Sequence, residues 1–461
     1  MKALRDPQQL LLGGLAAIRE QYRVLDSFPS DVLAAAELAA RRVPAEHADR
    51  TGMPFATLDP ASSTDLDQAF AIEPSGADLL LHYAIADVAW FVADGDPLDR
   101  EAWRRGTTTY LPDGKAGLYP PVLAEGAASL LPDGPRPAVV FTVRVAPDGA
   151  VKLDGAERAL IRSRAKLAYD TVRADQLPSG FGELASRIAA AEDRRGAARV
   201  DPPEQEVELG PDGRYVLLLR PQLASERHNA AMSLATNMAI ADALFAAHTG
   251  LFRVMPPPDA RAVARLRFTA RAFALDWPDA MPLAEFERSL DPAAPRHAAF
   301  MLAIRRAGNG AAYEAFEPGR RPWHAAMAAT YAHGTAPLRR LADRYVVRAA
   351  LAVANGRPVP AEVTEAFTRL PATMARAGAR DGQIERAVID LAETALLSGR
   401  EGEAFDAVVT DTGENGARIQ LCELPVVART TAHSIQPGAR IRVRLLTADT
   451  GRRTLQFERI A

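Results

Sequence analysis

The sequence predicts an α+β protein with a small helical N-terminal module, a central domain of mixed sheet and helices, and a C-terminal OB-fold β-barrel. Three observations support this fold class. The first 50 residues have helical apolar spacing, short alternating strands follow "PFATLD", and such strands return after residue 402. With 461 residues, 48% of them hydrophobic, the chain can bury a large core in two or three domains.

Residues 1–50 are expected to form a helix-turn-helix-like module. Asp6 and Pro7 suit the start of a helix over "DPQQLLLGGLAAIREQYRV", and Ser30 suits the start of a second over "PSDVLAAAELAARRV". The N-terminus lacks the pattern of a secretory signal, and no uncharged run approaches the roughly 20 residues of a membrane span. We therefore expect a cytoplasmic protein with no membrane partner. We also expect a monomer.

The central domain is expected over residues 51–398. Its first part contains the strand patterns "QAFAIE", "ADLLLHYAIADVAWFV" and "AVVFTVRVAPDGAVKLDGAERALI", the last with an Asp-Gly turn between two alternating runs. From about residue 160 the spacing becomes mostly helical, as in "HNAAMSLATNMAIADALFAAH". Residues 402–461 then give "FDAVVTDT", "GARIQLCE", "ARIRVRLLTAD" and "RRTLQFERI", a spacing typical of a five-stranded OB-type barrel.

Composition limits the chemistry of any site. Cys422 is the single cysteine, which excludes a disulfide framework and cysteine-ligated zinc within one chain. Any metal must therefore be held by oxygen or histidine. A net charge of −3 provides no overall basic field, so a nucleic-acid partner would need local grooves.

The stretch "TLDPASSTDLDQAF" concentrates three aspartates, Asp59, Asp65 and Asp67, just before an alternating run. One interpretation is a solvated loop in which Asp and Ser form turns and caps. The other is a site for Mg²⁺, a hard cation that binds carboxylates, waters and substrate phosphates.

Residues 57–73 resemble the aspartate motif of the ribonuclease II family, in which four aspartates at this spacing follow a Thr-apolar pair. The resemblance extends in order through "LHYAIADVAWFV", "GTTTYLP", "RRGAARVDPPE" and "HAAMAATYAHGTAPLRRLADRYV", and so covers roughly residues 50–395. The C-terminal strands are similar to the OB-type RNA-binding domain that ends these enzymes. The N-terminus departs from the family, because about 50 helical residues stand where two cold-shock barrels are usual.

The resemblance implies an RNB catalytic domain that hydrolyses single-stranded RNA processively, 3′→5′ and with Mg²⁺, to nucleoside 5′-monophosphates. Asp59, Asp65 and Asp67 would form the carboxylate cluster, with Asp59 a direct ligand and Asp67 orienting the attacking water or a second metal. Gln68 stands at the position of the fourth aspartate, where an amide oxygen can still coordinate but lacks the charge. We therefore expect weakened Mg²⁺ affinity, with Mn²⁺ a possible substitute.

The resemblance also assigns RNA contacts. Arg339 matches the arginine that stabilises charge on the scissile phosphate, and Arg340 beside it would contact RNA. Tyr110 matches a tyrosine that stacks on a nucleotide near the cut. Glu385 corresponds to a glutamate that contacts the last nucleotides. Val200 aligns with the phenylalanine that sandwiches the 3′-terminal base, so this clamp would be looser.

Two alternatives stay open. A catalytically weakened family member could act mainly as an RNA-binding protein through its barrel and helical module. An unrelated phosphatase or nuclease with an Asp-x-Asp metal motif would explain the aspartates but not "TYAHGTAPLRR".

Overall fold

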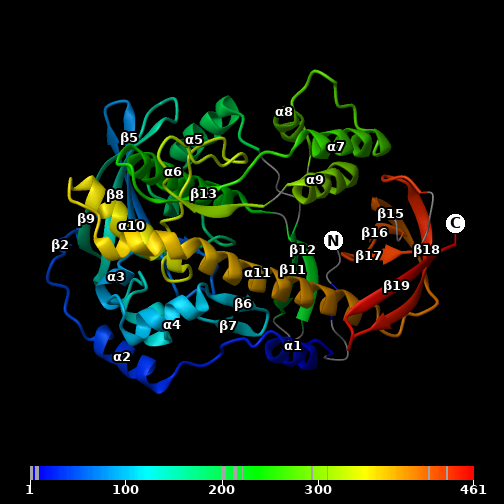
Figure 1. Cartoon of the computed structure of the whole chain (residues 1–461), viewed down its shortest axis with the longest axis horizontal. Helices are drawn as coiled ribbons and strands as arrows, with labels where there is room; N and C mark the ends of the chain where they lie inside the picture. Colours follow the sequence, from blue (N-terminus) through cyan, green and yellow to red (C-terminus); the bar gives the residue numbers. More distant parts are fainter. Residues whose placement is uncertain are drawn as a thin grey trace.

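The computed structural model describes residues 4–5, 10–198, 204–210, 215–220, 222–291, 294–308, 310–413, 416–431 and 435–460. The predicted α+β fold is confirmed: the chain has two N-terminal helices, a body of sheet and helices on the left of Figure 1, and a barrel on the right. In the part of the chain that the structure describes, no helix is long and apolar enough to cross a membrane.

A mixed sheet forms the body. In the described residues it has seven strands in the order β10, β3, β4, β5, β8, β9 and β2, with bounds Ala165–Ala168, Ala56–Asp59, Gln68–Ser75, Asp78–Ala86, Arg136–Val145, Val151–Ile161 and Ala48–Asp49. The pairs β10 with β3 and β2 with β9 are parallel, and the other neighbours are antiparallel. The predicted Asp-Gly turn joins β8 to β9, where Gly149 has a φ of 72° and a Cβ would collide with the backbone of Arg187.

Helices cover this sheet. α6 packs on strands β5, β8 and β9, and α10 packs on α6 and β9. Fully buried Ala235, Ile240 and Leu244 of α6 join the sheet's core. The helices of the body have the bounds α3 Val88–Phe91, α4 Pro97–Arg105, α5 Phe181–Arg195, α6 Ala224–Ala246 and α10 Leu341–Ala354, with short turns η1 Leu123–Ala127 and η2 Ala174–Gln176.

The two predicted N-terminal helices are present as α1 (Leu10–Gln21) and α2 (Ser30–Ala40). They belong to different cores. Leu15 of α1 packs with Leu391 of the long helix α11 (Ala361–Leu397), whereas Val32 of α2 joins the core of the central sheet. Both helices are therefore packed onto the rest of the chain.

The C-terminal strands close into a barrel, as predicted. Its five strands, counted within the described ranges, follow the order β15, β16, β17, β19 and β18, with bounds Ala404–Gly413, Gly416–Leu421, Val427–Thr430, Thr454–Arg459 and Arg440–Asp449. Alternate residues such as Val409, Val443 and Leu445 fill its interior. Leu397, the last residue of α11, is part of the same core, so the helix is docked to the barrel.

The remaining elements lie between the body and the barrel or beside them. Three helices form a separate small core above the barrel in Figure 1. These helices and the remaining strands are α7 Ala260–Ala272, α8 Leu283–Arg288, α9 Pro295–Ala307, β1 Leu4–Arg5, β6 Thr109–Leu111, β7 Gly114–Ala116, β11 Glu204–Leu209, β12 Tyr215–Arg220, β13 Leu251–Val254 and β14 Ala312–Ala315.

Candidate active site

The loop between β3 and β4 carries the three aspartates. Asp59 ends β3, and Asp65 and Asp67 precede β4, which begins at Gln68. Fully buried Leu66 anchors the loop, and its backbone N–H donates to Ser129 Oγ at 2.9 Å. The carbonyl of Asp67 accepts from the backbone N–H of Ala86 at 2.9 Å. The loop is therefore ordered by packing and backbone hydrogen bonds rather than left in solvent.

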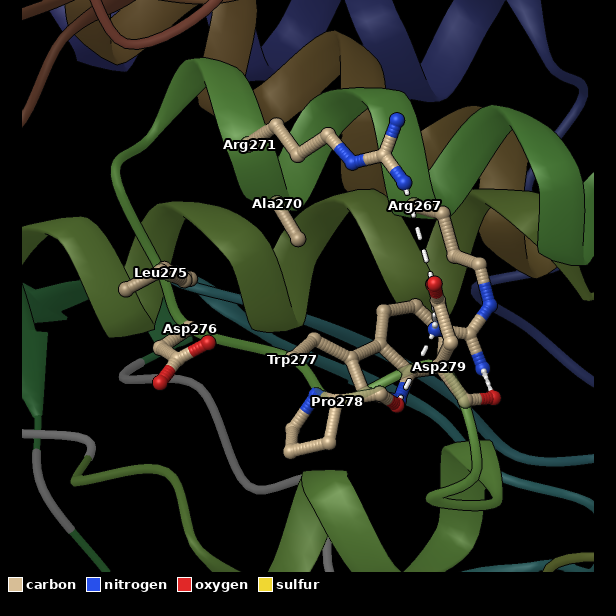
Figure 2. Close-up of a pocket in the computed structure, with 8 residues that line it drawn as sticks. All are labelled: Arg267, Ala270, Arg271, Leu275, Asp276, Trp277, Pro278 and Asp279. Atoms are coloured by element: carbon tan, nitrogen blue, oxygen red, sulfur yellow. Dashed lines mark hydrogen bonds and ion pairs between the residues drawn. The ribbon is translucent and has the colours of Figure 1, made fainter.

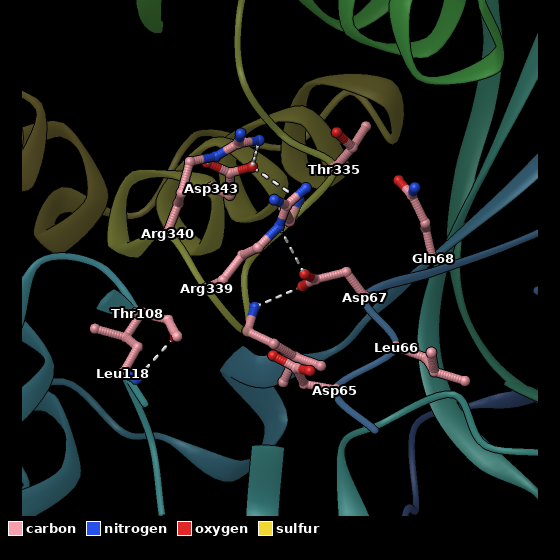
Figure 3. A network of polar contacts seen from close by, with 12 residues as sticks. Asp65, Leu66, Asp67, Gln68, Thr108, Leu118, Thr335, Arg339, Arg340 and Asp343 are labelled. Carbon is pink, nitrogen blue, oxygen red and sulfur yellow. Dashed lines mark hydrogen bonds and ion pairs between the residues drawn. The ribbon is translucent and has the colours of Figure 1, made fainter. Parts of the chain in front are cut away.

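Asp67 meets the segment that carries the second motif. Its Oδ1 accepts the backbone N–H of Leu338 at 2.7 Å, and Arg339 Nε lies 3.4 Å from its Oδ2 (Figure 3). Asp67 is buried, while the side chain of Arg339 is 48% exposed. The structure thus joins two sequence motifs into one site that has a buried carboxylate and an accessible guanidinium.

Two buried side chains fix the segment before α10. Asn237 of α6 accepts from the backbone N–H of Gly334 at 2.9 Å. Asp343 of α10 accepts from the N–H of Ala336 at 2.8 Å and binds Arg340 through two hydrogen bonds of 2.9 and 2.7 Å. Arg340 is therefore held within the chain by a bidentate ion pair, and its predicted role as an RNA contact stays a prediction.

Tyr110 and Lys115 approach Asp65 from the β6–β7 hairpin. The Tyr110 hydroxyl donates to Asp65 Oδ2 at 3.1 Å, and Lys115 Nζ donates to Asp65 Oδ1 at 2.7 Å. Both oxygens of Asp65 are thus engaged. Tyr110 is 53% exposed, so its ring remains available for stacking.

Burial dominates the electrostatics of the other two aspartates. It raises the pKa of Asp59 to about 7, against the opposing charges of Arg339 and Lys166. It raises the pKa of Asp67 to about 8, opposed by Arg339 and by the hydrogen bond from Leu338. The cations of the chain therefore compensate these two buried carboxylates only in part.

The donor set partly fits a divalent cation. Asp59 Oδ2 is buried and has no hydrogen-bond partner among the described residues, whereas both oxygens of Asp67 are engaged, one by the N–H of Leu338 and the other by Arg339. Gln68 is directed away from Asp67 in Figure 3, and its Oε1 accepts from the Tyr83 hydroxyl at 2.7 Å. Within the described ranges, no three His, Cys, Asp or Glu side chains form a metal-binding group. The free Asp59 oxygen fits a metal ion, whereas the ligand roles of Asp65, Asp67 and Gln68 stay predictions.

Two predicted RNA contacts, Glu385 and Val200, lie outside the contacts described above. Glu385 is exposed on α11, and Val200 lies outside the described residues.

Sequence reasoning missed three residues of the site, Lys115, Asn237 and Asp343. The Arg-x-x-Asp spacing at the start of a helix could have revealed Asp343 as the partner of Arg340, but no local signal pointed to the other two.

A separate cavity of about 270 Å³ lies between α7 and the loop that follows it (Figure 2). The guanidinium of Arg267 lies over the Trp277 ring, 4.2 Å from its centroid. Arg267 and Arg271 both pair with Asp279, at 3.6 and 3.7 Å. Their charge is compensated locally, and the cavity shares no residue with the carboxylate site.

Comparison with known proteins decides the family. Residues 48–355 match the RNB domain, which is more than half of the chain. The chain belongs to the RNB-domain family. Residues 403–460 of this RNB protein match the RNase II-type exonuclease C-terminal S1 domain, so the predicted resemblance to the ribonuclease II family is confirmed.

Curated relatives of the RNB protein include ribonuclease R of Aquifex aeolicus, 27% identical over 459 residues, with 92% of this chain and 63% of the relative covered. Exoribonuclease 2 of Enterobacter sp. is 30% identical over 418 residues, with 83% and 62% covered. The chain thus spans less than two thirds of the length of these relatives.

Two solved structures share the fold. One is Mycoplasma genitalium RNase R in complex with ribose-methylated single-stranded RNA, with a TM-score of 0.88, 19% identity, and coverage of 98% of this chain and 78% of that chain. The other is yeast Ssd1, described as a pseudonuclease, with a TM-score of 0.70, 16% identity, and coverage of 94% and 57%.

Proposed function

We propose that this RNB protein hydrolyses single-stranded RNA processively in the 3′→5′ direction and releases nucleoside 5′-monophosphates with Mg²⁺ as cofactor. The observation that carries the proposal is the pairing of buried Asp67 with half-exposed Arg339, 3.4 Å apart, in an RNB domain. In this arrangement the carboxylate can orient the attacking water while the guanidinium binds the phosphate.

Phosphodiester hydrolysis requires an activated water and neutralisation of charge at phosphorus, and a bound Mg²⁺ supplies both. Asp59 and Asp67 would hold this ion. Asp67 would also orient the attacking water, because its carboxylate is fixed by Leu338. Arg339 would donate to the non-bridging phosphate oxygens, and these hydrogen bonds would strengthen as negative charge develops in the transition state.

The exposed Tyr110 ring would stack on a base near the cut. Its hydroxyl is bonded to Asp65, so the ring is fixed beside the carboxylates before RNA arrives. On the barrel, Arg440, Arg442 and Arg444 are the exposed alternate residues of β18 and would contact the RNA backbone. Arg340, Glu385 and Val200 keep the roles proposed from the family resemblance, whereas Gln68, whose amide oxygen is bonded to Tyr83, is not expected to coordinate the ion.

The decisive experiment is incubation of 5′-labelled poly(A) with the full chain and Mg²⁺. We expect a ladder that ends in a short product, with release of 5′-mononucleotides. Asp67→Asn should abolish the ladder while the variant still folds and binds RNA. Degradation from the 5′ end, or release of 3′-monophosphates, would contradict the proposal.

A second candidate is a weakened family member that mainly binds RNA. Two observations favour it: position 68 holds an amide bonded to Tyr83 instead of a carboxylate, and both oxygens of Asp65 are engaged. The same poly(A) assay separates the candidates, because an RNA-binding protein would shift the labelled RNA without shortening it at any Mg²⁺ or Mn²⁺ concentration.

We further propose a monomer that acts in the cytoplasm, with units at residues 1–50, 51–398 and 402–461. Size-exclusion chromatography with light scattering tests the monomer, and fractionation of the source cells tests the location. Limited proteolysis tests the unit boundaries. α1 packs with α11 and α2 packs with the central sheet, so residues 1–50 are held on the rest of the chain at two places. We therefore expect cleavage near residue 400 before cleavage near residue 50.

A further inference from the structure

The β6–β7 hairpin places an ammonium group inside the carboxylate site. Tyr110 and Lys115 are direct cross-strand partners, so their side chains share one face of the hairpin. Lys115 Nζ lies 2.7 Å from Asp65 Oδ1 and 3.3 Å from Glu125 Oε1. The Lys115 side chain is 24% exposed and that of Asp65 only 10%. The ion pair is therefore largely shielded from solvent.

A second carboxylate holds the lysine in place. Glu125 comes from η1, and its other oxygen accepts from Thr64 Oγ1 at 2.8 Å. Lys115 is thus clamped between two acids that are themselves hydrogen-bonded. The sequence contains only four lysines, Lys2, Lys115, Lys152 and Lys166, among 55 basic residues. Lysine carries a compact point charge, the form of positive charge closest to that of a metal ion.

The ammonium and a divalent cation would compete for Asp65. Both oxygens of Asp65 already have donors, and a metal ion bound there would stand a few ångströms from the Lys115 charge. Like charges at that separation repel strongly in a partly desolvated site. Asp59 Oδ2, by contrast, has no hydrogen-bond partner among the described residues.

We propose that Lys115 is the resident counter-ion of this site: it withdraws Asp65 from metal coordination and limits the resting protein to one divalent cation, bound through Asp59. The inference rests on the proposed function only in taking these carboxylates as the metal site. It concerns how many ions bind and through which residues.

The test is Mn²⁺ binding to the RNA-free full chain, followed by electron paramagnetic resonance and equilibrium dialysis. The wild type should bind one ion. Asp65→Asn should leave its Kd unchanged within about twofold, whereas Asp59→Asn should weaken binding tenfold or more. Lys115→Met should release Asp65 and add a second ion or tighten the first at least tenfold. Lys115→Met combined with Asp65→Asn should return to the wild-type value.

The matched control is Lys152→Met. Lys152 is 77% exposed and lies 3.7 Å from Asp154 on β9, so its removal should not alter Mn²⁺ binding. Two ions in the wild type, loss of binding in Asp65→Asn, or unchanged binding in Lys115→Met would each overturn the inference. If Lys115→Met fails to fold, as judged by circular dichroism, the comparison of Asp65→Asn with Asp59→Asn still decides. A protein that binds one Mn²⁺ in this way but degrades no RNA would refute the proposed function and leave this inference intact.

Discussion

Asp67 and Arg339 face each other where the β3–β4 loop meets the segment before α10, with Arg339 Nε 3.4 Å from Asp67 Oδ2. The burial of the two partners differs: Asp67 is enclosed, while nearly half of the Arg339 side chain is exposed. The carboxylate can therefore fix the orientation of the guanidinium without covering it.

Arg339→Ala should lower turnover of single-stranded RNA by about 10²-fold or more while RNA binding changes little, because its bonds to phosphate strengthen mainly in the transition state. Single-turnover rates and equilibrium binding on the same oligonucleotide measure the two effects. Arg320→Ala is the matched control, since Arg320 is 60% exposed and pairs with Glu314 and Glu317. Equal losses in binding and turnover would make Arg339 a docking residue only.

Gln68→Asp tests the departure from the family's fourth aspartate. The added charge alone would predict a Mg²⁺ midpoint several-fold lower. However, the Gln68 amide oxygen is bonded to Tyr83 and directed away from Asp67. We therefore expect the midpoint of RNA hydrolysis in Mg²⁺ and Mn²⁺ titrations to stay within about twofold of wild type. A several-fold decrease would show that residue 68 coordinates the ion.

Asp381→Ala should slow RNA hydrolysis about tenfold with little change in KM. Asp381 on α11 accepts from the hydroxyls of Thr107 and Thr109 at 2.6 and 2.7 Å, and so anchors the strand that leads into Tyr110. The backbone N–H of Thr108 donates to the carbonyl of Arg339 at 3.0 Å, which ties the same strand to the arginine.

The control for Asp381 is Glu365→Ala, an exposed acid on the same helix. If Asp381 acts through the two threonines, Thr107→Val with Thr109→Val should reproduce its effect, and adding Asp381→Ala should cost little more. Additive losses would assign Asp381 a different role.

The stability of the barrel contact should fall as pH rises. Burial raises the pKa of Glu393 from 4.5 to about 8. Between these values the folded protein retains a proton that the unfolded chain has lost, so the free energy of unfolding decreases with pH across this window. Glu393→Gln keeps an acceptor for the backbone N–H of Val427 and removes the titration. The free energy of unfolding, measured with urea, should decrease less between pH 5.5 and pH 8 for the variant than for the wild type. An equal decrease in both proteins would contradict the assignment.

Local sequence patterns predicted those helices, strands and turns whose formation depends on neighbouring residues. The Asp-Gly turn between β8 and β9, α6 and the barrel strands all follow from apolar periodicity and turn residues. Asp67 and Arg339 could be chosen from the sequence because motifs identified them, but only the fold shows their contact.

Contacts between distant segments were not predictable. Lys115 reaches Asp65 from 50 residues away, and the register of a short hairpin decides that contact. It was likewise not predictable that α1 and α2 would join different cores. Both helices have an ordinary amphipathic pattern, which shows that one face is buried but not which part of the chain covers it.

The docking of α11 has a consequence for engineering. Leu397 lies in the barrel core, and Glu393 accepts from the barrel residue Val427, whereas Asp381, twelve positions earlier and so roughly 18 Å away along the helix, holds the tyrosine strand. The last turn of α11, which holds Glu393 and Leu397, is therefore packed with the barrel, whereas Leu391 still packs with α1. A chimera that exchanges the S1 barrel with a relative should keep this last turn together with its own barrel, because a junction at the 399–402 turn would separate the barrel from the helix residues that complete its core.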